Sequence, residues 1–193
     1  MYTQPFWIEG NWPGRVAVSP RPRGSDWLED EMKQWRQQGV DVVVSLLMPE
    51  EMEEFELQQE QRYCEESGML FYSLSIIDRS VPNSIQDVWE VVGNLESELS
   101  AGKSVVVHCR QGIGRSGLIA IMLLMQKGQS LQGAIALVSK GTRRRRSRNF
   151  GATGVVAGDC RPVCLIRIAI RKRPTSGGGR YKSKGGNVLA GVC

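Results

Sequence analysis

The stretch VVVHCRQGIGRSG, Val105 to Gly117, constrains the fold of this chain more than any other. Three valines lead into His108 and Cys109, and a second apolar run starts at Gly117. A short apolar, β-branched run favours a buried strand, and a longer apolar segment behind a glycine-containing loop favours a helix. The stretch therefore predicts a buried strand, a short loop and a helix in direct succession.

The loop of this stretch has the length and composition of an anion cradle. Between Cys109 and Arg115 stand Arg110, Gln111, Gly112, Ile113 and Gly114. Such a loop can turn its backbone N–H groups inward, and the helix behind it adds unpaired N–H groups and the positive end of its dipole. Gly112 and Gly114 can adopt backbone angles closed to other residues. We therefore predict that residues 110–115 bind a phosphate group.

Cys109 is placed to act as a nucleophile at the mouth of this cradle. Helix N-termini and neighbouring arginines favour the thiolate form of a cysteine, so no general base is needed. His108 is the only histidine, which excludes a three-histidine zinc site. Because neighbours on a strand point to opposite faces, His108 is also poorly placed to deprotonate Cys109. The alternative interpretation is a buried structural cysteine in a tight turn.

The segment HCRQGIGRSG carries the cysteine, five residues and arginine of the protein tyrosine phosphatase superfamily, and resembles its dual-specificity and kinase-associated branch. The resemblance implies a metal-independent phosphomonoester hydrolase that forms a phosphocysteine and needs no cofactor. Arg115 can hold two phosphate oxygens bidentately. Ser116 can cap the helix, and the resemblance adds a hydrogen bond to the Cys109 sulfur. It also implies that His108 is buried and hydrogen-bonded beneath the loop, supporting its backbone.

Asp78 is the candidate general acid. It lies 31 residues before Cys109, at the end of an apolar run and in a loop that reaches Pro82. This position resembles that of the mobile loop carrying the acid in the superfamily. The reaction needs such a group because the leaving oxygen must gain a proton. Taken alone, an aspartate at a strand end is more often a turn residue.

The order of the elements predicts an α/β fold with a central, mostly parallel sheet flanked by helices, in a phosphatase-type sandwich. The predicted strands cover 6–8, 15–18, 40–47, 69–77 and 103–107. The predicted helices cover 26–38, 85–99, 117–126 and 130–140. Between 50 and 66 many glutamates surround a few apolar residues. We interpret them mainly as a solvated helical face, the alternative being a surface that selects basic substrates.

The charge divides the chain in two. Residues 142–193 hold 13 of the 25 lysines and arginines and carry a net charge of +12, whereas residues 1–141 carry −7. We therefore predict a dual-specificity-type phosphatase domain over 1–140 and a basic, Gly/Arg-rich tail over 141–193. The tail is expected to be disordered or translated out of frame. A genuine basic arm that binds nucleic acid or an acidic surface is the alternative.

The remaining expectations concern location, partners and rival functions. The sequence has no run of 18 apolar residues, and its five cysteines are irregularly spaced, so we predict a cytoplasmic location. The expected partner is a phosphorylated protein or peptide. Two other functions stay open: a phosphate-binding module that lacks turnover because the C-terminal part of the fold is missing, and a phosphoinositide phosphatase.

Overall fold

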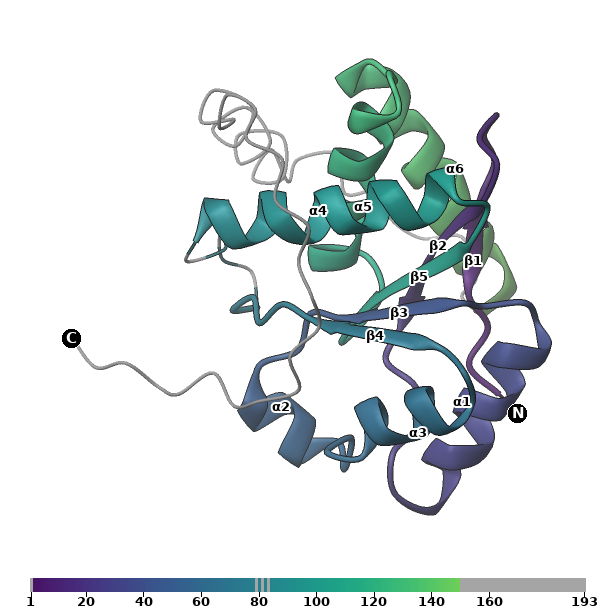
Figure 1. Ribbon diagram of the computed structural model, residues 1–193, viewed down its shortest axis with the longest axis vertical. Coiled ribbons are helices and arrows are strands. Elements are labelled where there is room, and N and C mark those ends of the chain that lie inside the picture. The colour runs from purple at the N-terminus through teal and green to yellow at the C-terminus, as the bar shows by residue number, and fades with distance from the viewer. Residues whose placement is uncertain (1, 79, 81, 83, 150–193) are drawn as a thin grey trace.

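The computed structural model describes residues 2–149 apart from 79, 81 and 83. Its centre is a five-stranded sheet in the order β1-β2-β5-β3-β4 (Figure 1). The strands are β1 (Phe6–Ile8), β2 (Arg15–Pro20), β3 (Val42–Ser45), β4 (Leu70–Ser73) and β5 (Ser104–Cys109). Only β1 runs antiparallel to its neighbour, and every other pairing is parallel. The predicted mostly parallel α/β sheet is therefore confirmed.

Helices cover both faces of the sheet (Figure 1). The short 3-10 helix η1 (Ser25–Trp27) leads into α1, and the α-helices are α1 (Leu28–Gln37), α2 (Pro49–Glu54), α3 (Glu60–Glu66), α4 (Ile85–Ser100), α5 (Arg115–Gln126) and α6 (Leu131–Asn149). One apolar cluster joins α4, α5 and α6 to the sheet, and a second joins α1 and α3 to the opposite face. Alternate residues of β5 enter the two clusters, because successive side chains of a strand point to opposite faces.

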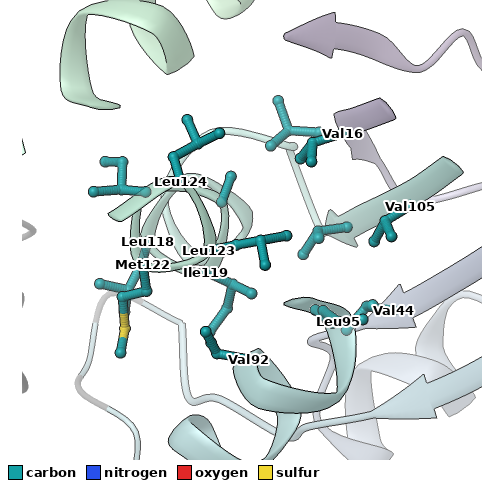
Figure 2. Packing of buried hydrophobic residues seen from close by; sticks show 14 of the residues in the cluster. Val16, Val44, Val92, Leu95, Val105, Leu118, Ile119, Met122, Leu123 and Leu124 are labelled. Carbon is teal, nitrogen blue, oxygen red and sulfur yellow. The ribbon is translucent and has the colours of Figure 1, made fainter. Parts of the chain in front are cut away.

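Helix α5 anchors the first of these clusters. All its residues from Arg115 to Leu124 are buried. Figure 2 shows Ile119 and Leu123 among side chains of α4 and of the strands. The sequence predicts this placement, since a helix that is apolar on all sides must lie in the core. Arg115, the first residue of α5, is therefore held by a rigid, buried helix.

Strand β5 occupies the middle of the sheet. It pairs with β2 on one side and with β3 on the other. The strand ends at Cys109, so the loop that follows leaves the sheet at the carboxyl edge of three parallel strands. Ligands of parallel α/β sheets bind at this edge.

Several predicted elements differ from the structure in their extent. The strands predicted over 40–47 and 69–77 are shorter, at Val42–Ser45 and Leu70–Ser73. The glutamate-rich stretch forms two helices, α2 and α3, rather than one pattern, because the chain turns at Glu56, whose φ is +54°. The helix predicted over 130–140 continues as α6 to Asn149. Arginine is a good helix former, so the change of charge near residue 141 does not end the helix. The predicted division between 140 and 141 falls inside α6 and stays a prediction; the tail beyond 149 lies outside the described residues.

None of the helices in the described part of the chain is long and apolar enough to span a membrane.

Candidate active site

The loop from Cys109 to Arg115 packs closely against the end of β2. Gly112 has a φ of +70°, in the left-handed region that favours glycine. A Cβ atom built there would lie 2.4 Å from the backbone nitrogen of Pro20 and 2.4 Å from the carbonyl carbon of Ser19. Backbone atoms cannot give way as a flexible side chain can. The loop therefore requires glycine at position 112.

Gly114 differs from the sequence-based expectation. Its φ is −77°, which any residue can adopt, and a Cβ built there meets no atom of the described chain within 4 Å. The glycine is not needed for the backbone path. Only Gly112 of the two uses the freedom that the sequence predicted for both.

The two glycines give a matched prediction. Gly112→Ala is expected to lower the free energy of unfolding by roughly 2–3 kcal/mol or more, because positive φ and a backbone clash coincide there. Gly114→Ala should cost well under about 1 kcal/mol in the same urea titration, as neither strain nor clash applies. Equal losses in the two variants would contradict the described loop.

Cys109 lies at the base of the loop, with its side chain inside. The residue is 3% exposed. Its sulfur accepts a hydrogen bond from the backbone N–H of Gly112 at 3.3 Å, and the Ser116 hydroxyl lies 3.5 Å from it. The loop backbone and the first turn of α5 both contact the sulfur. The structure thus brings together Cys109 and Ser116, which the sequence predicts as partners.

Arg115 is held from several sides at the start of α5. Its Nη1 donates to the carbonyls of Leu46 at 3.3 Å and Ile76 at 2.9 Å. Both terminal nitrogens also bind the carboxylate of Glu51, at 2.5 and 2.8 Å. Among the described residues Nε has no hydrogen-bond partner, although it is buried. The guanidinium is therefore fixed by its Nη1–Nη2 end, whereas the described residues leave Nε without a partner.

Glu51 is the residue of this site that the sequence-based interpretation missed. The hydrogen bond from Arg115 lowers the pKa of the Glu51 carboxyl, despite an opposing effect of burial. For Arg115, burial alone would lower the pKa, but Glu51 and the nearby Cys109 and Asp78 outweigh it and raise it. The sequence held a signal for this residue: in Met48-Pro49-Glu50-Glu51, directly after a buried strand, proline stands where a helix begins and Glu51 stands at the capping position. Glu51 also accepts the Met48 N–H at 3.0 Å, as a capping glutamate does.

Asp78 lies at the same edge of the sheet. Its Oδ1 is 3.3 Å from Nη2 of Arg115, and its side chain is 54% exposed. The chain reaches this position after β4, through residues whose N–H groups bind Ser45 and Leu46. A residue 31 positions upstream of Cys109 is thus brought next to Arg115, and its role as the general acid stays a prediction.

The predicted loop residues on either side of Gly112 lie at the rim. Arg110, Gln111 and Ile113 are exposed. The Arg110 guanidinium lies 3.2 Å from a Glu54 oxygen and stacks over the ring of Phe55. Because the Arg110 side chain points toward Glu54 and Phe55, we predict that Arg110, Gln111 and Ile113 contribute to phosphate binding through their backbone N–H groups.

His108 lies on the other face of the sheet. It is fully buried, as predicted, but its side chain meets Glu60 at the start of α3 rather than the loop. Nε2 of His108 and Oε1 of Glu60 are 2.8 Å apart with both side chains inaccessible, although the contact lacks the alignment of a good hydrogen bond. The edge of the Trp35 ring covers the imidazole, with a centroid distance of 6.1 Å. The predicted support of the loop backbone by a hydrogen bond from His108 is therefore corrected to a buried pair with Glu60.

The pair leads to a prediction about stability. His108→Leu leaves the Glu60 carboxyl group buried without its partner and is expected to lower the free energy of unfolding by about 1–3 kcal/mol. Replacing both residues by leucine should recover most of that loss, because apolar side chains in place of both members of a buried polar pair are often nearly neutral in stability. Urea titration of the two variants tests this. A double variant as unstable as the single one would show that Glu60 is not the cause.

Comparisons with known proteins give a matching family model and several solved structures of similar fold. The family model described as "Polymorphic toxin system, DSP-PTPase phosphatase" matches residues 17–129, more than half of the chain. A comparison with curated proteins gave no match. The solved structure of kinase associated phosphatase with serine in place of its catalytic cysteine superposes with a TM-score of 0.67 at 16% identity, over 88% of this chain and 93% of that one.

Two further structures extend the similarity. Tk-PTP in its active form has a TM-score of 0.61 and 25% identity, over 88% of this chain and 97% of its own. PTPMT1 in complex with PI(5)P has a TM-score of 0.61 and 15% identity, over 86% and 96%. The match of the family model, the shared fold and the Cys109–Arg115 loop lead to one conclusion: the chain belongs to the DSP-PTPase phosphatases and is a cysteine-dependent phosphatase of the protein tyrosine phosphatase superfamily.

Proposed function

We propose that the chain hydrolyses phosphomonoesters of proteins in two steps, through a phosphocysteine on Cys109. The observation that carries the proposal is the arrangement of three groups at one sheet edge. The Cys109 sulfur lies inside the loop, and Arg115 is fixed while its Nε has no partner within the described part of the chain. A carboxyl oxygen of Asp78 is 3.3 Å from the same guanidinium. Nucleophile, anion binder and acid are the groups that this reaction needs.

In the first step the Cys109 thiolate attacks phosphorus, and the bond from phosphorus to the ester oxygen breaks. Asp78, protonated, gives its proton to the leaving oxygen. Nε and Nη2 of Arg115, with the backbone N–H groups of residues 110–115, hold the phosphoryl oxygens. These contacts strengthen as the phosphoryl group becomes planar, because their donors are already positioned.

In the second step water attacks the phosphocysteine, and the bond between sulfur and phosphorus breaks. Asp78, now ionised, accepts a proton from the water. Ser116 lies 3.5 Å from the sulfur, so its hydroxyl can donate to the departing thiolate. The products are inorganic phosphate and the free enzyme.

The direct test is hydrolysis of a generic aryl phosphate in the presence of a chelator, with vanadate as a phosphate mimic. We expect turnover without added metal, inhibition by vanadate, and a phosphorylated protein trapped by rapid acid quenching. If the protein binds phosphate but hydrolyses no ester, the result would instead support a phosphate-binding module that lacks turnover. A marked preference for phosphoinositides over phosphopeptides would support the lipid alternative. A cytoplasmic location stays a prediction beside this proposal.

Glu51 is expected to orient Arg115, and its effect should depend on pH. Since pairing with Arg115 lowers its pKa in the folded state, the stabilisation is complete above the unfolded value and is lost as pH falls through the folded value. Glu51→Gln should therefore cost about 1.5–3 kcal/mol at neutral pH and progressively less in acid. Thermal melting from pH 7 down to about 3 measures this.

Glu53→Gln is the matched control, because Glu53 is an exposed glutamate of the same helix. The melting temperature of this variant should equal that of the parent at every pH. A Glu51→Gln deficit that is constant with pH would mean that the lost stability does not come from the charged pair.

A further inference from the structure

Two arginines stand side by side next to the nucleophile. The last pair of the parallel ladder of β2 and β5 is Pro20 with Cys109, so Arg21 and Arg110 directly follow the two strands. The backbone N–H of Arg21 reaches the Arg110 carbonyl at 3.5 Å. Their guanidinium carbons lie 4.0 and 4.9 Å from the centroid of the Phe55 ring. Two cations thus share one aromatic ring at the edge of the phosphate loop.

Among the described residues, only one of these two arginines has a carboxylate partner. Arg110 contacts one Glu54 oxygen at 3.2 Å, in a pair whose side chains are about half exposed. The Arg21 guanidinium donates to the neighbouring Pro22 carbonyl at 3.1 Å and meets no carboxylate in the described part of the chain. Two like charges at one aromatic ring repel each other, and the exposed ion pair with Glu54 contributes little. An anion from outside would relieve this repulsion.

The Phe55 ring that both arginines contact is connected to Arg115 through α2. Phe55 directly follows α2 as its C-cap, and its N–H donates to the carbonyl of Glu51, the residue that holds Arg115. A guanidinium over an aromatic face is attracted to the ring and loses freedom of movement. Arg21 and Arg110 are therefore held at a set position relative to the phosphate cradle.

Two exposed isoleucines flank the site and favour a peptide as the occupant. Ile113 in the loop and Ile77, which precedes Asp78, are each 45% exposed. A peptide offers apolar side chains and backbone to such a rim, together with an acidic side chain for the arginines. The polar ring of an inositol headgroup has no apolar partner for these isoleucines.

We propose that Arg21 and Arg110, stacked on Phe55, form a subsite for an acidic residue adjacent to the phosphorylated residue of a peptide substrate. The proposal rests on the phosphatase function proposed above and names its substrate class. The phosphate enters the Cys109 loop, and the neighbouring carboxylate binds the two guanidinium groups.

The test compares two phosphotyrosine peptides that differ only in having glutamate or alanine on both sides of the phosphotyrosine. For the full chain, kcat/KM is expected to be roughly tenfold higher for the acidic peptide at low salt, as expected for a charge-assisted contact. The ratio should fall as salt screens the exposed charges. Arg21→Ala should bring it close to one, and Arg21→Lys should restore part of it. Arg62→Ala, at an exposed arginine of α3 paired with Glu66, should keep the parent ratio.

Peptide binding to Cys109→Ser separates this proposal from the proposed reaction, because binding needs no turnover. A parent that hydrolyses nothing, while Cys109→Ser binds the acidic peptide more tightly, would sustain the subsite and refute the reaction. Equal use of both peptides by an active parent, or an unchanged ratio in Arg21→Ala, overturns the subsite. It is also overturned if Arg21→Ala impairs hydrolysis of a bisphosphorylated inositol lipid in vesicles and leaves the peptide ratio unchanged.

Discussion

Cys109→Ser is expected to reduce hydrolysis of an aryl phosphate by a factor of roughly 10⁴–10⁶, which is the scale on which loss of a nucleophile acts. A serine hydroxyl stays protonated at neutral pH and needs a general base. The imidazole of His108, the only histidine, lies on the opposite face of the sheet and is paired with Glu60. His108 is therefore not placed to activate the hydroxyl. Phosphate binding should persist in the variant, because the loop and Arg115 are unchanged. Steady-state kinetics measure the loss of hydrolysis, and calorimetry measures the binding of phosphate.

Cys64→Ser is the matched control. Cys64 is a buried cysteine of α3 whose sulfur lies 3.3 Å from that of Met32, and burial raises its pKa far above the ordinary range of a thiol. Its replacement can lower stability, but the folded protein should keep the parent rate. If Cys109→Ser retains a substantial part of the activity, or if Cys64→Ser removes it, Cys109 is not the nucleophile.

The phosphate loop and the fold around it could be predicted because their determinants are local. The residues between Val105 and Gly117 specify the strand, the loop and the helix by their own sequence. Helical and strand periodicity then supplied the remaining elements, and parallel pairing placed the loop at the carboxyl edge. The glycine requirement was predicted for Gly112 and Gly114 alike, but only Gly112 lies against another strand. The difference comes from β2, which is about 90 residues away in the chain, a separation that local pattern cannot bridge.

The partners of the site could not be predicted, because each comes from a distant segment. Glu51 and Glu60 belong to one glutamate-rich stretch and were interpreted as part of a solvated face. The structure instead places them against Arg115 and His108, on opposite faces of the sheet. Composition identifies such a stretch as acidic, but only the packing of α2 and α3 distinguishes a buried carboxylate from an exposed one.

Asp78→Asn should separate proton donation from phosphate binding. It is expected to slow hydrolysis of esters with poor leaving groups by roughly 10²–10⁴, the usual contribution of a general acid. Asparagine has nearly the same size and still reaches Arg115, but it has no proton to give. For an aryl phosphate whose leaving oxygen departs as a stable anion, the first step should proceed at nearly the parent rate.

The measurement is a series of aryl phosphates of graded leaving-group acidity, followed by single-turnover kinetics on the parent and on Asp78→Asn. The slope against leaving-group acidity should steepen in the variant, because the whole negative charge then develops on the leaving oxygen. Asp87→Asn is the control, since Asp87 lies in the first turn of α4, where its N–H binds Ser84. A loss in Asp78→Asn that is equally large for every leaving group would mean that Asp78 only helps Glu51 to hold Arg115, and another proton donor would then be required.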